Sequence, residues 1–170
     1  MNRKRWISLY VENEPGVLAR ISGLFSQKAY NLDSLTVGVT EDASVSRMTI
    51  GLTSDDRTFE QIKKQLNRSV EVIRVVDLTD AAVHMRELMF VKVSCCSVQD
   101  MERLSFIKEA YGVRTAGYDM QTVLLECVQT EQKNDELKRL LESGFPNRIE
   151  IVRGGSVAVE AVVQFDVRQS

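Results

Sequence analysis

Histidine and cysteine are scarce in this sequence, and their scarcity excludes a structural zinc site. The 170 residues contain one histidine, His84, and three cysteines, Cys95, Cys96 and Cys127, without Cys-x-x-Cys spacing. A structural zinc site takes four clustered Cys or His ligands, which this chain does not offer. Cys95 and Cys96 lie in an apolar run, where we expect them to pack as small hydrophobic residues. The odd number of cysteines favours a reducing compartment.

The sequence also lacks a long hydrophobic run and an excess of basic charge. No stretch of about 20 apolar residues occurs, so we expect no membrane span. Met1–Trp6 is basic, but no signal-peptide core follows it, and we expect a cytoplasmic protein. The net charge of -2 and the pI of about 5.6 argue against nucleic acid or an anionic membrane as a partner.

Hydrophobic periodicity predicts the order strand, helix, strand, strand, helix, strand in the first half of the chain. The expected strands are residues 6–11, 31–40, 45–53 and 70–78. Residues 16–28 have apolar positions at helical spacing. A second helix is expected after the capping oxygens of residues 54–56, with Phe59, Ile62 and Leu66 on its buried face.

The same order of elements recurs in the second half. The expected strands are residues 87–95, 114–118, 121–129 and 148–152, and the helices are residues 101–111 and 134–143. We expect Gly144 to be a C-cap glycine, and the segment after Gly154-Gly155 is ambiguous between strand and helix. The predicted fold is therefore α+β, with two tandem ferredoxin-like βαββαβ sandwiches. They would span residues 4–78 and 86–165, joined by a linker at 79–85.

The second strand of the first sandwich is an unprotected sheet edge. It carries one charge, Asp33, and neither lysine nor proline, whereas the other edge carries Glu71, Arg74 and Asp77. An apolar open edge pairs readily with another chain. We therefore expect a homodimer joined along residues 31–39 of the first domain. The alternative is that the second domain of the same chain covers this edge.

The turn Asn13-Glu14-Pro15-Gly16 precedes a predicted helix and forms a candidate anion site. The first helical N–H groups, those of about Gly16, Val17 and Leu18, lack intrahelical acceptors and lie at the positive end of the helix dipole. Gly16 allows a ligand to approach the backbone, and the Asn13 side chain offers both donors and an acceptor. The same residues also make an ordinary turn before a helix, so the turn alone is weak evidence.

A second chain would complete this site. Across the expected dimer, Asn31 and Leu32 of the partner's edge strand could lie against the turn. An amino-acid head group would then bind at Asn13 and Gly16. Its side chain would enter a small aliphatic slot near Val11, Leu18 and Leu32.

Several motifs resemble a known family. Residues 11–18 resemble the opening turn of ACT domains, the amino-acid-binding modules of metabolic regulation. The motifs that are similar to the small, regulatory subunit of acetohydroxyacid (acetolactate) synthase are residues 20–27, 30–37, 46–50, 60–66 and 72–75. This resemblance covers residues 4–78 closely, and residues 87–93 resemble the start of that family's second domain.

The resemblance implies a non-catalytic subunit that activates a large catalytic subunit. The large subunit would hold thiamine diphosphate, magnesium and FAD, and this chain would bind no cofactor. The resemblance also implies feedback inhibition by a branched-chain amino acid, which we expect to be valine. The implied effector residues are Asn13, Gly16, Val17 and Leu18 of one chain with Asn31 and Leu32 of the other.

One position departs from the family. The family commonly has glycine before the Tyr-Asn pair, where this chain has Ala29. A β-carbon at a helix C-cap with positive φ costs about 1 kcal/mol. Either the helix ends differently here or the strain is tolerated, and the choice bears on the placement of Asn31.

Three other functions compete with this interpretation. An independent enzyme would need a perturbed histidine or a carboxylate pair in a cleft, and His84 stands alone in the expected linker. An RNA-binding module of the same topology would need stacking aromatics on its third strand, and residues 46–52 contain none. Another ACT-type sensor would share the turn but not the other motifs.

Overall fold

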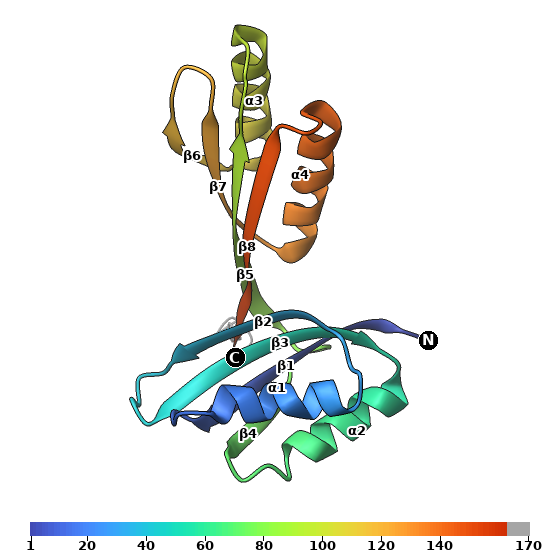
Figure 1. Ribbon diagram of the computed structural model, residues 1–170. Coiled ribbons are helices and arrows are strands. Elements are labelled where there is room, and N and C mark those ends of the chain that lie inside the picture. Colours follow the sequence, from blue (N-terminus) through green and yellow to red (C-terminus); the bar gives the residue numbers. More distant parts are fainter. Residues whose placement is uncertain (163–170) are drawn as a thin grey trace, which may run out of the picture. The chain divides into compact units, whose positions relative to one another are not determined.

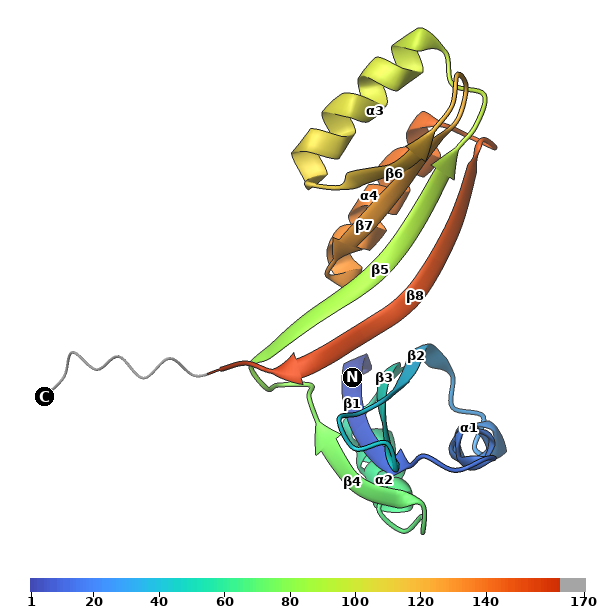
Figure 2. The same cartoon turned by 90° about the vertical axis from the view of Figure 1, so that its left-hand side faces the viewer.

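The computed structural model describes residues 1–162 and divides into two compact units. The first comprises Met1–His84 with the segment from Val157 onward, and the second comprises Met85–Ser156. Each unit has a four-stranded antiparallel sheet with two helices on one face (Figures 1 and 2). This confirms the predicted α+β class and the two ferredoxin-like sandwiches.

The first unit has the strand order β2-β3-β1-β4. Its elements are β1 (Arg3–Glu12), α1 (Val17–Gln27), β2 (Leu32–Val39), β3 (Val45–Ser54), α2 (Asp56–Leu66) and β4 (Val72–Asp77). β2 and β4 are the two edges, as predicted. β2 therefore presents one free side within this unit.

The core of the first unit lies between its sheet and its helices. Alternate residues of β1 (Ile7, Leu9 and Val11) are fully buried, as the period of two along a strand requires. The α2 face predicted from helical spacing is confirmed, since Phe59, Ile62 and Leu66 are at most 2% exposed. Asp55 caps α2 by accepting from Thr58 N–H at 2.9 Å.

The second unit repeats the topology with the strand order β6-β7-β5-β8. Its elements are β5 (Val83–Val93), α3 (Val98–Tyr111), β6 (Arg114–Tyr118), β7 (Val123–Gln129), α4 (Glu131–Gly144) and β8 (Ile149–Glu160). Its core is a separate apolar cluster built on β5, β7 and both helices.

Three boundaries in the second half differ from the predictions. α4 begins at Glu131, because the Thr130 hydroxyl accepts from Lys133 N–H and caps the helix earlier. Gly144 is not the C-cap: the helix ends at the buried Phe145, whose N–H donates to Leu141 O at 2.8 Å. The ambiguous segment is a strand, since β8 continues through Gly154-Gly155.

The region around the predicted linker also differs in detail. β5 begins at Val83, inside residues 79–85, and His84 is an exposed strand residue. Cys96 and Cys127 are buried, and burial raises the pKa of the Cys127 thiol to about 11. Cys95 was wrongly predicted to pack inside: it follows β5, is exposed and has φ of 56°. Residues 163–165 of the predicted second domain lie outside the described residues.

Candidate functional site

The N-terminus of α1 is the least capped helix start in the described chain. Gly16 is its N-cap residue, with φ of 87°, and provides no side-chain cap. The first turn of α1 contains no acidic residue. By contrast, α2, α3 and α4 each have an oxygen-bearing side chain at the N-cap and an acidic residue in the first turn. The positive end of the α1 dipole is therefore left without a carboxylate from the first turn of its own helix.

The free backbone donors at this helix end differ slightly from the prediction. Val17 N–H donates to Glu14 O at 3.3 Å, so it is not available as predicted. Arg20 N–H already closes the first helical turn onto Gly16 O at 3.0 Å. Within residues 1–162, the N–H groups of Gly16, Leu18 and Ala19 have no protein acceptor. Three donors thus remain at this helix end, and those of Gly16 and Leu18 were predicted.

Arg20 adds a cation that the sequence analysis did not place in the site. A β-carbon on Gly16 would lie 3.1 Å from Arg20 Nη1, so the guanidinium reaches back over the turn. Arg20 Nε also pairs with Glu71 Oε1 at 2.5 Å. The Ser69 hydroxyl, with Arg20, holds the pKa of Glu71 below its usual value. The spacing of four residues from Gly16 was the signal that could have identified Arg20.

Asn13 is committed to holding the turn. Its Nδ2 donates to Ala43 O at 2.9 Å, and its Oδ1 accepts from the Ser46 hydroxyl at 2.9 Å. Its backbone N–H donates to Ser44 O at 2.7 Å. The side chain therefore fastens the turn to the β2–β3 hairpin, and one amide hydrogen is left for a ligand.

The other predicted site residues divide by exposure. Leu18 is 43% exposed and Asn31 is also exposed, whereas Leu32 is half-buried. Val17 is 2% exposed and Val11 is fully buried. Val11 therefore cannot line a slot as predicted, because its side chain lies in the core. The Val17 side chain is buried as well, and its N–H already donates to Glu14 O.

In a single chain the structure does not bring Asn31 to the turn. Leu32 pairs with Leu52, and Val39 pairs with Ser46. Because Glu12 pairs with Val45, the turn adjoins the Val39 end of β2. Asn31 lies just before the opposite end of β2, roughly 26 Å from Val39 at 3.3 Å per residue.

The C-terminal end of α1 shows how Ala29 takes the place of the glycine that is common in the family. Ala29 has φ of 54°, the left-handed conformation expected of glycine. Its N–H donates to Ser26 O, and Tyr30 N–H donates to Phe25 O, each at 3.0 Å. These two bonds form a Schellman motif. The strain is tolerated, and the exit toward Asn31 is the one a glycine would give.

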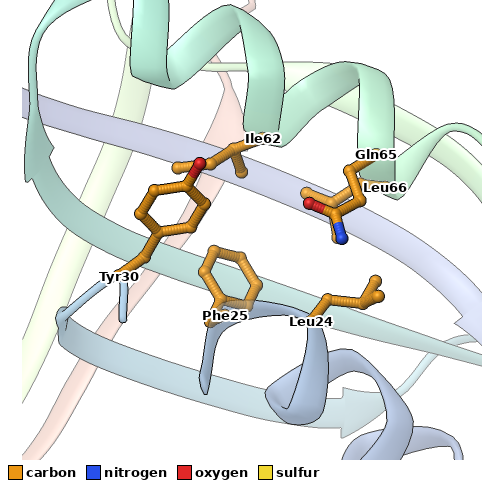
Figure 3. A pocket seen from close by; sticks show the side chains of 6 residues that line it. All are labelled: Leu24, Phe25, Tyr30, Ile62, Gln65 and Leu66. Atoms are coloured by element: carbon orange, nitrogen blue, oxygen red, sulfur yellow. The ribbon is translucent and has the colours of Figure 1, made fainter. Parts of the chain in front are cut away.

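A small cavity between α1 and α2 is too small to be the effector site. Figure 3 shows its walls, which come from both helices and from Tyr30 just after α1. Its volume is about 10 Å³, room for one water at most. The residues that line it are Leu24, Phe25, Tyr30, Ile62, Gln65 and Leu66.

Comparisons with known proteins identify the family of both halves of the chain. Residues 7–74 match the family described as the AHAS small subunit-like ACT domain, and residues 86–162 match the family described as the small subunit of acetolactate synthase. The chain is 33% identical over 158 residues to the acetolactate synthase small subunit of Buchnera aphidicola, covering 92% of this chain and 98% of that one. The chain belongs to the acetolactate synthase small subunit family. A second relative, the isozyme 3 small subunit of Salmonella typhimurium, is 37% identical, with 92% and 94% covered.

A solved member of the family has the same fold. The acetolactate synthase small subunit from Thermotoga maritima superimposes with a TM-score of 0.84 at 28% identity, covering 95% of this chain and 99% of that one. Both halves of this chain therefore match small-subunit families, the second as well as the ACT domain. Among residues 1–162 no helix is long and apolar enough to cross a membrane, and no group of His, Cys, Asp and Glu is arranged to hold a metal.

Proposed function

We propose that this chain activates the large catalytic subunit of acetolactate synthase and makes it sensitive to valine. Membership of the small-subunit family supports the regulatory role. The observation that carries the effector proposal is the open N-terminus of α1, which lies in the same unit as an exposed apolar sheet edge. The thiamine diphosphate, magnesium and FAD would belong to the large subunit, and this chain would bind none of them.

The exposed edge supports a symmetric dimer through β2. Val37 and Val39 of this strand are 49% and 60% exposed, and Leu18 of α1 is 43% exposed. Isolated surface valines are common, but two on one open edge strand, with a third apolar side chain on α1 of the same unit, favour burial against a partner. Pairing two β2 strands would bury all three and join the sheets of two first units.

Antiparallel pairing also explains how one site draws on two chains. With the twofold axis near Leu35 and Thr36, the Leu32 end of the partner's β2 lies beside Val39. The partner's Asn31 then approaches the turn. Within one chain, Asn31 and the turn lie at opposite ends of β2.

The residues suit an amino acid with an aliphatic side chain. The ligand carboxylate would accept from the N–H groups of Gly16 and Leu18 at the positive end of α1, with Arg20 adding charge. The Oδ1 atom of the partner's Asn31 would accept from the α-ammonium. The Leu18 side chain and Leu32 of the partner subunit would enclose the aliphatic group.

Valine would act by favouring one arrangement of the dimer, in which the large subunit is less active. Linkage then requires that the large subunit change valine affinity by the same factor. A coupling of roughly 1–3 kcal/mol, or about 5- to 150-fold, is ordinary for such systems.

Calorimetric titration tests the proposal. The full chain is titrated with valine, leucine, isoleucine, serine and phenylalanine, and the activity of the large subunit is measured with and without the chain. We expect heat from the aliphatic amino acids, one ligand per chain, and inhibition in the same order. Absence of a heat of binding with all three aliphatic amino acids would contradict the effector proposal. If the chain activated the large subunit but no amino acid had an effect, the regulatory role would stand and the proposal that valine is the effector would be wrong.

A further inference from the structure

The second unit contains a hollow between α3 and the edge strand β6 that no part of the proposed valine site uses. Figure 2 shows α3 on the same side of the second sheet as α4, alongside β6. The hollow has a volume of about 310 Å³. This is at the lower end of the range for small-molecule sites, and equals about ten water molecules at roughly 30 Å³ each.

The walls of the hollow are apolar and come from the rigid core. Leu104 of α3 is 2% exposed, and Val123 and Leu125 of β7 are 7% and 1% exposed. These side chains are held by the cluster that stabilises the whole unit. A bound aliphatic group would therefore meet a preformed surface.

The charge in the lining of the hollow is positive. Lys108 is the charged side chain among the lining residues, and it is half-buried. Within residues 1–162 it makes no ion pair. Ser105, one helical turn before Lys108, and Thr115 on β6 add hydroxyl groups. The lining contains no carboxylate.

We propose that this hollow binds a small aliphatic carboxylate that lacks an α-ammonium group. The ligand carboxylate pairs with Lys108 and accepts from the hydroxyls of Ser105 and Thr115. Its hydrocarbon part packs on Met101, Val123 and the ring of Tyr118, above the buried Leu104 and Leu125. An amino acid is disfavoured, because its ammonium group would lie near Lys108 with no acidic side chain to compensate it. The second unit is thereby a separate ligand-binding module. It selects an anion, whereas the proposed valine site selects a zwitterion.

Three ligands with one carbon skeleton test the charge requirement. Amide NMR spectra of the full-length chain are recorded during titration with 3-methylbutanoate, with valine, which is its 2-amino derivative, and with the uncharged 3-methylbutanamide. We expect 3-methylbutanoate to give saturable shifts in α3 and β6. We expect binding of the amide there to be weaker by about 10-fold or more, since charge-assisted hydrogen bonds are lost. Valine should leave these resonances unchanged.

A matched pair of variants locates the contact. Lys108→Met keeps an apolar stem of similar length and should weaken 3-methylbutanoate binding by about 10-fold. Lys138→Met removes a lysine of α4 that pairs with Glu142 and does not line the hollow, and it should change nothing. The proposal is overturned by absence of saturable shifts in α3 and β6, by equal binding of valine there, or by unchanged affinity in Lys108→Met. Shifts of these resonances that depend on protein concentration alone would identify a second copy as the occupant, and would also overturn it. None of these results alters valine binding at residues 13–18, so the two proposals fail separately.

Discussion

The first helices of the two units occupy the same place in the same topology but begin in opposite ways. α1 begins at Gly16, with no side-chain cap and no acidic residue. α3 begins with a capping box: the Ser97 hydroxyl accepts from Asp100 N–H, and the Asp100 carboxylate accepts from Ser97 N–H at 2.9 Å. Arg148 Nη1 donates to the same carboxylate at 3.0 Å. The second unit supplies its own anion at the helix end, and the first has no anion in the corresponding turn.

The comparison shows why the proposed effector site is placed in the first unit: its helix end has no internal carboxylate, whereas that of the second unit has one. Arg148 and Ser97 hold the pKa of the Asp100 carboxyl at about 2. An internal carboxylate so well satisfied leaves little advantage for an external one. The guanidinium groups of Arg20 and Arg148 lie at comparable helix ends, but only Arg148 faces a carboxylate of the first helical turn.

The largest effect is expected from breaking the edge on which the first site depends. Val37→Asp combined with Val39→Asp places charges on the free side of β2 and should dissociate the dimer, since the interface would bury carboxylates that have no partner. Valine binding should be lost with it. Ile73→Asp on the other edge, β4, changes a side chain that is 58% exposed and should preserve both. Sedimentation velocity measures the outcome, and a dimer that survives the double change would contradict pairing through β2.

Filling the open helix end should make the first unit resemble the second. Gly16→Asp places a carboxylate beside the donors and Arg20, and should lower valine affinity by about 100-fold or more through lost charge-assisted bonds. Gly16→Ala is the control, because it has the same positive-φ strain and the same contact with Arg20 without the charge. Calorimetry distinguishes them. Equal losses in both variants would attribute the effect to the backbone instead of the anion.

Removing the internal anion should weaken the second unit in a pH-dependent way. Asp100→Asn should lower the unfolding midpoint at neutral pH, because the capping box and the Arg148 pair are weakened. The pKa of Asp100 is depressed in the folded state, so its stabilisation is complete above 3.8 and is lost as the pH falls toward 2. The midpoints of the parent and the variant should therefore converge across that range. Glu150→Gln, in an exposed pair with Lys92, is the control and should show little difference.

The smallest effect concerns the other ends of the same two helices. α1 ends with Ala29 at φ of 54°, and α3 ends with Gly112 at φ of 62°. Ala29→Gly should stabilise the first unit, and Gly112→Ala should destabilise the second, each by about 1 kcal/mol. A β-carbon on Gly112 would meet no atom within 4 Å, so its cost is conformational. Urea denaturation measures both, and effects of the same sign would contradict this explanation.

Much of the fold could be predicted because strong periodic patterns coincide with the core. Phe59, Ile62 and Leu66 are spaced by helical turns and are buried as that spacing requires. The edge position of β2 follows from the topology alone. Where the pattern weakens, the sequence left strand and helix open: β8 continues through Gly154-Gly155 because pairing with β5 outweighs the low strand propensity of glycine.

The site was predicted less completely than the fold. Gly16 and Leu18 were placed correctly at the open helix end. The roles of the other residues depend on tertiary contacts: the Val11 side chain faces the core, and the Asn13 side chain hydrogen-bonds to the β2–β3 hairpin. Arg20 was overlooked because helical periodicity placed it off the buried face. The direction in which its side chain points is set by packing against Glu71, which is distant in sequence.

Mixing two inactive chains tests most directly whether the valine site is shared between subunits. Gly16→Asp and Asn31→Ala chains are prepared separately, each expected not to bind valine, and are then unfolded together and refolded in equal amounts. In a mixed dimer one site carries both changes and the other carries neither. Random pairing makes half the dimers mixed, so valine capacity should return to about a quarter of the parent value in calorimetry. No recovery of capacity, with dimer exchange verified by mass spectrometry, would place the site within one chain and contradict the account.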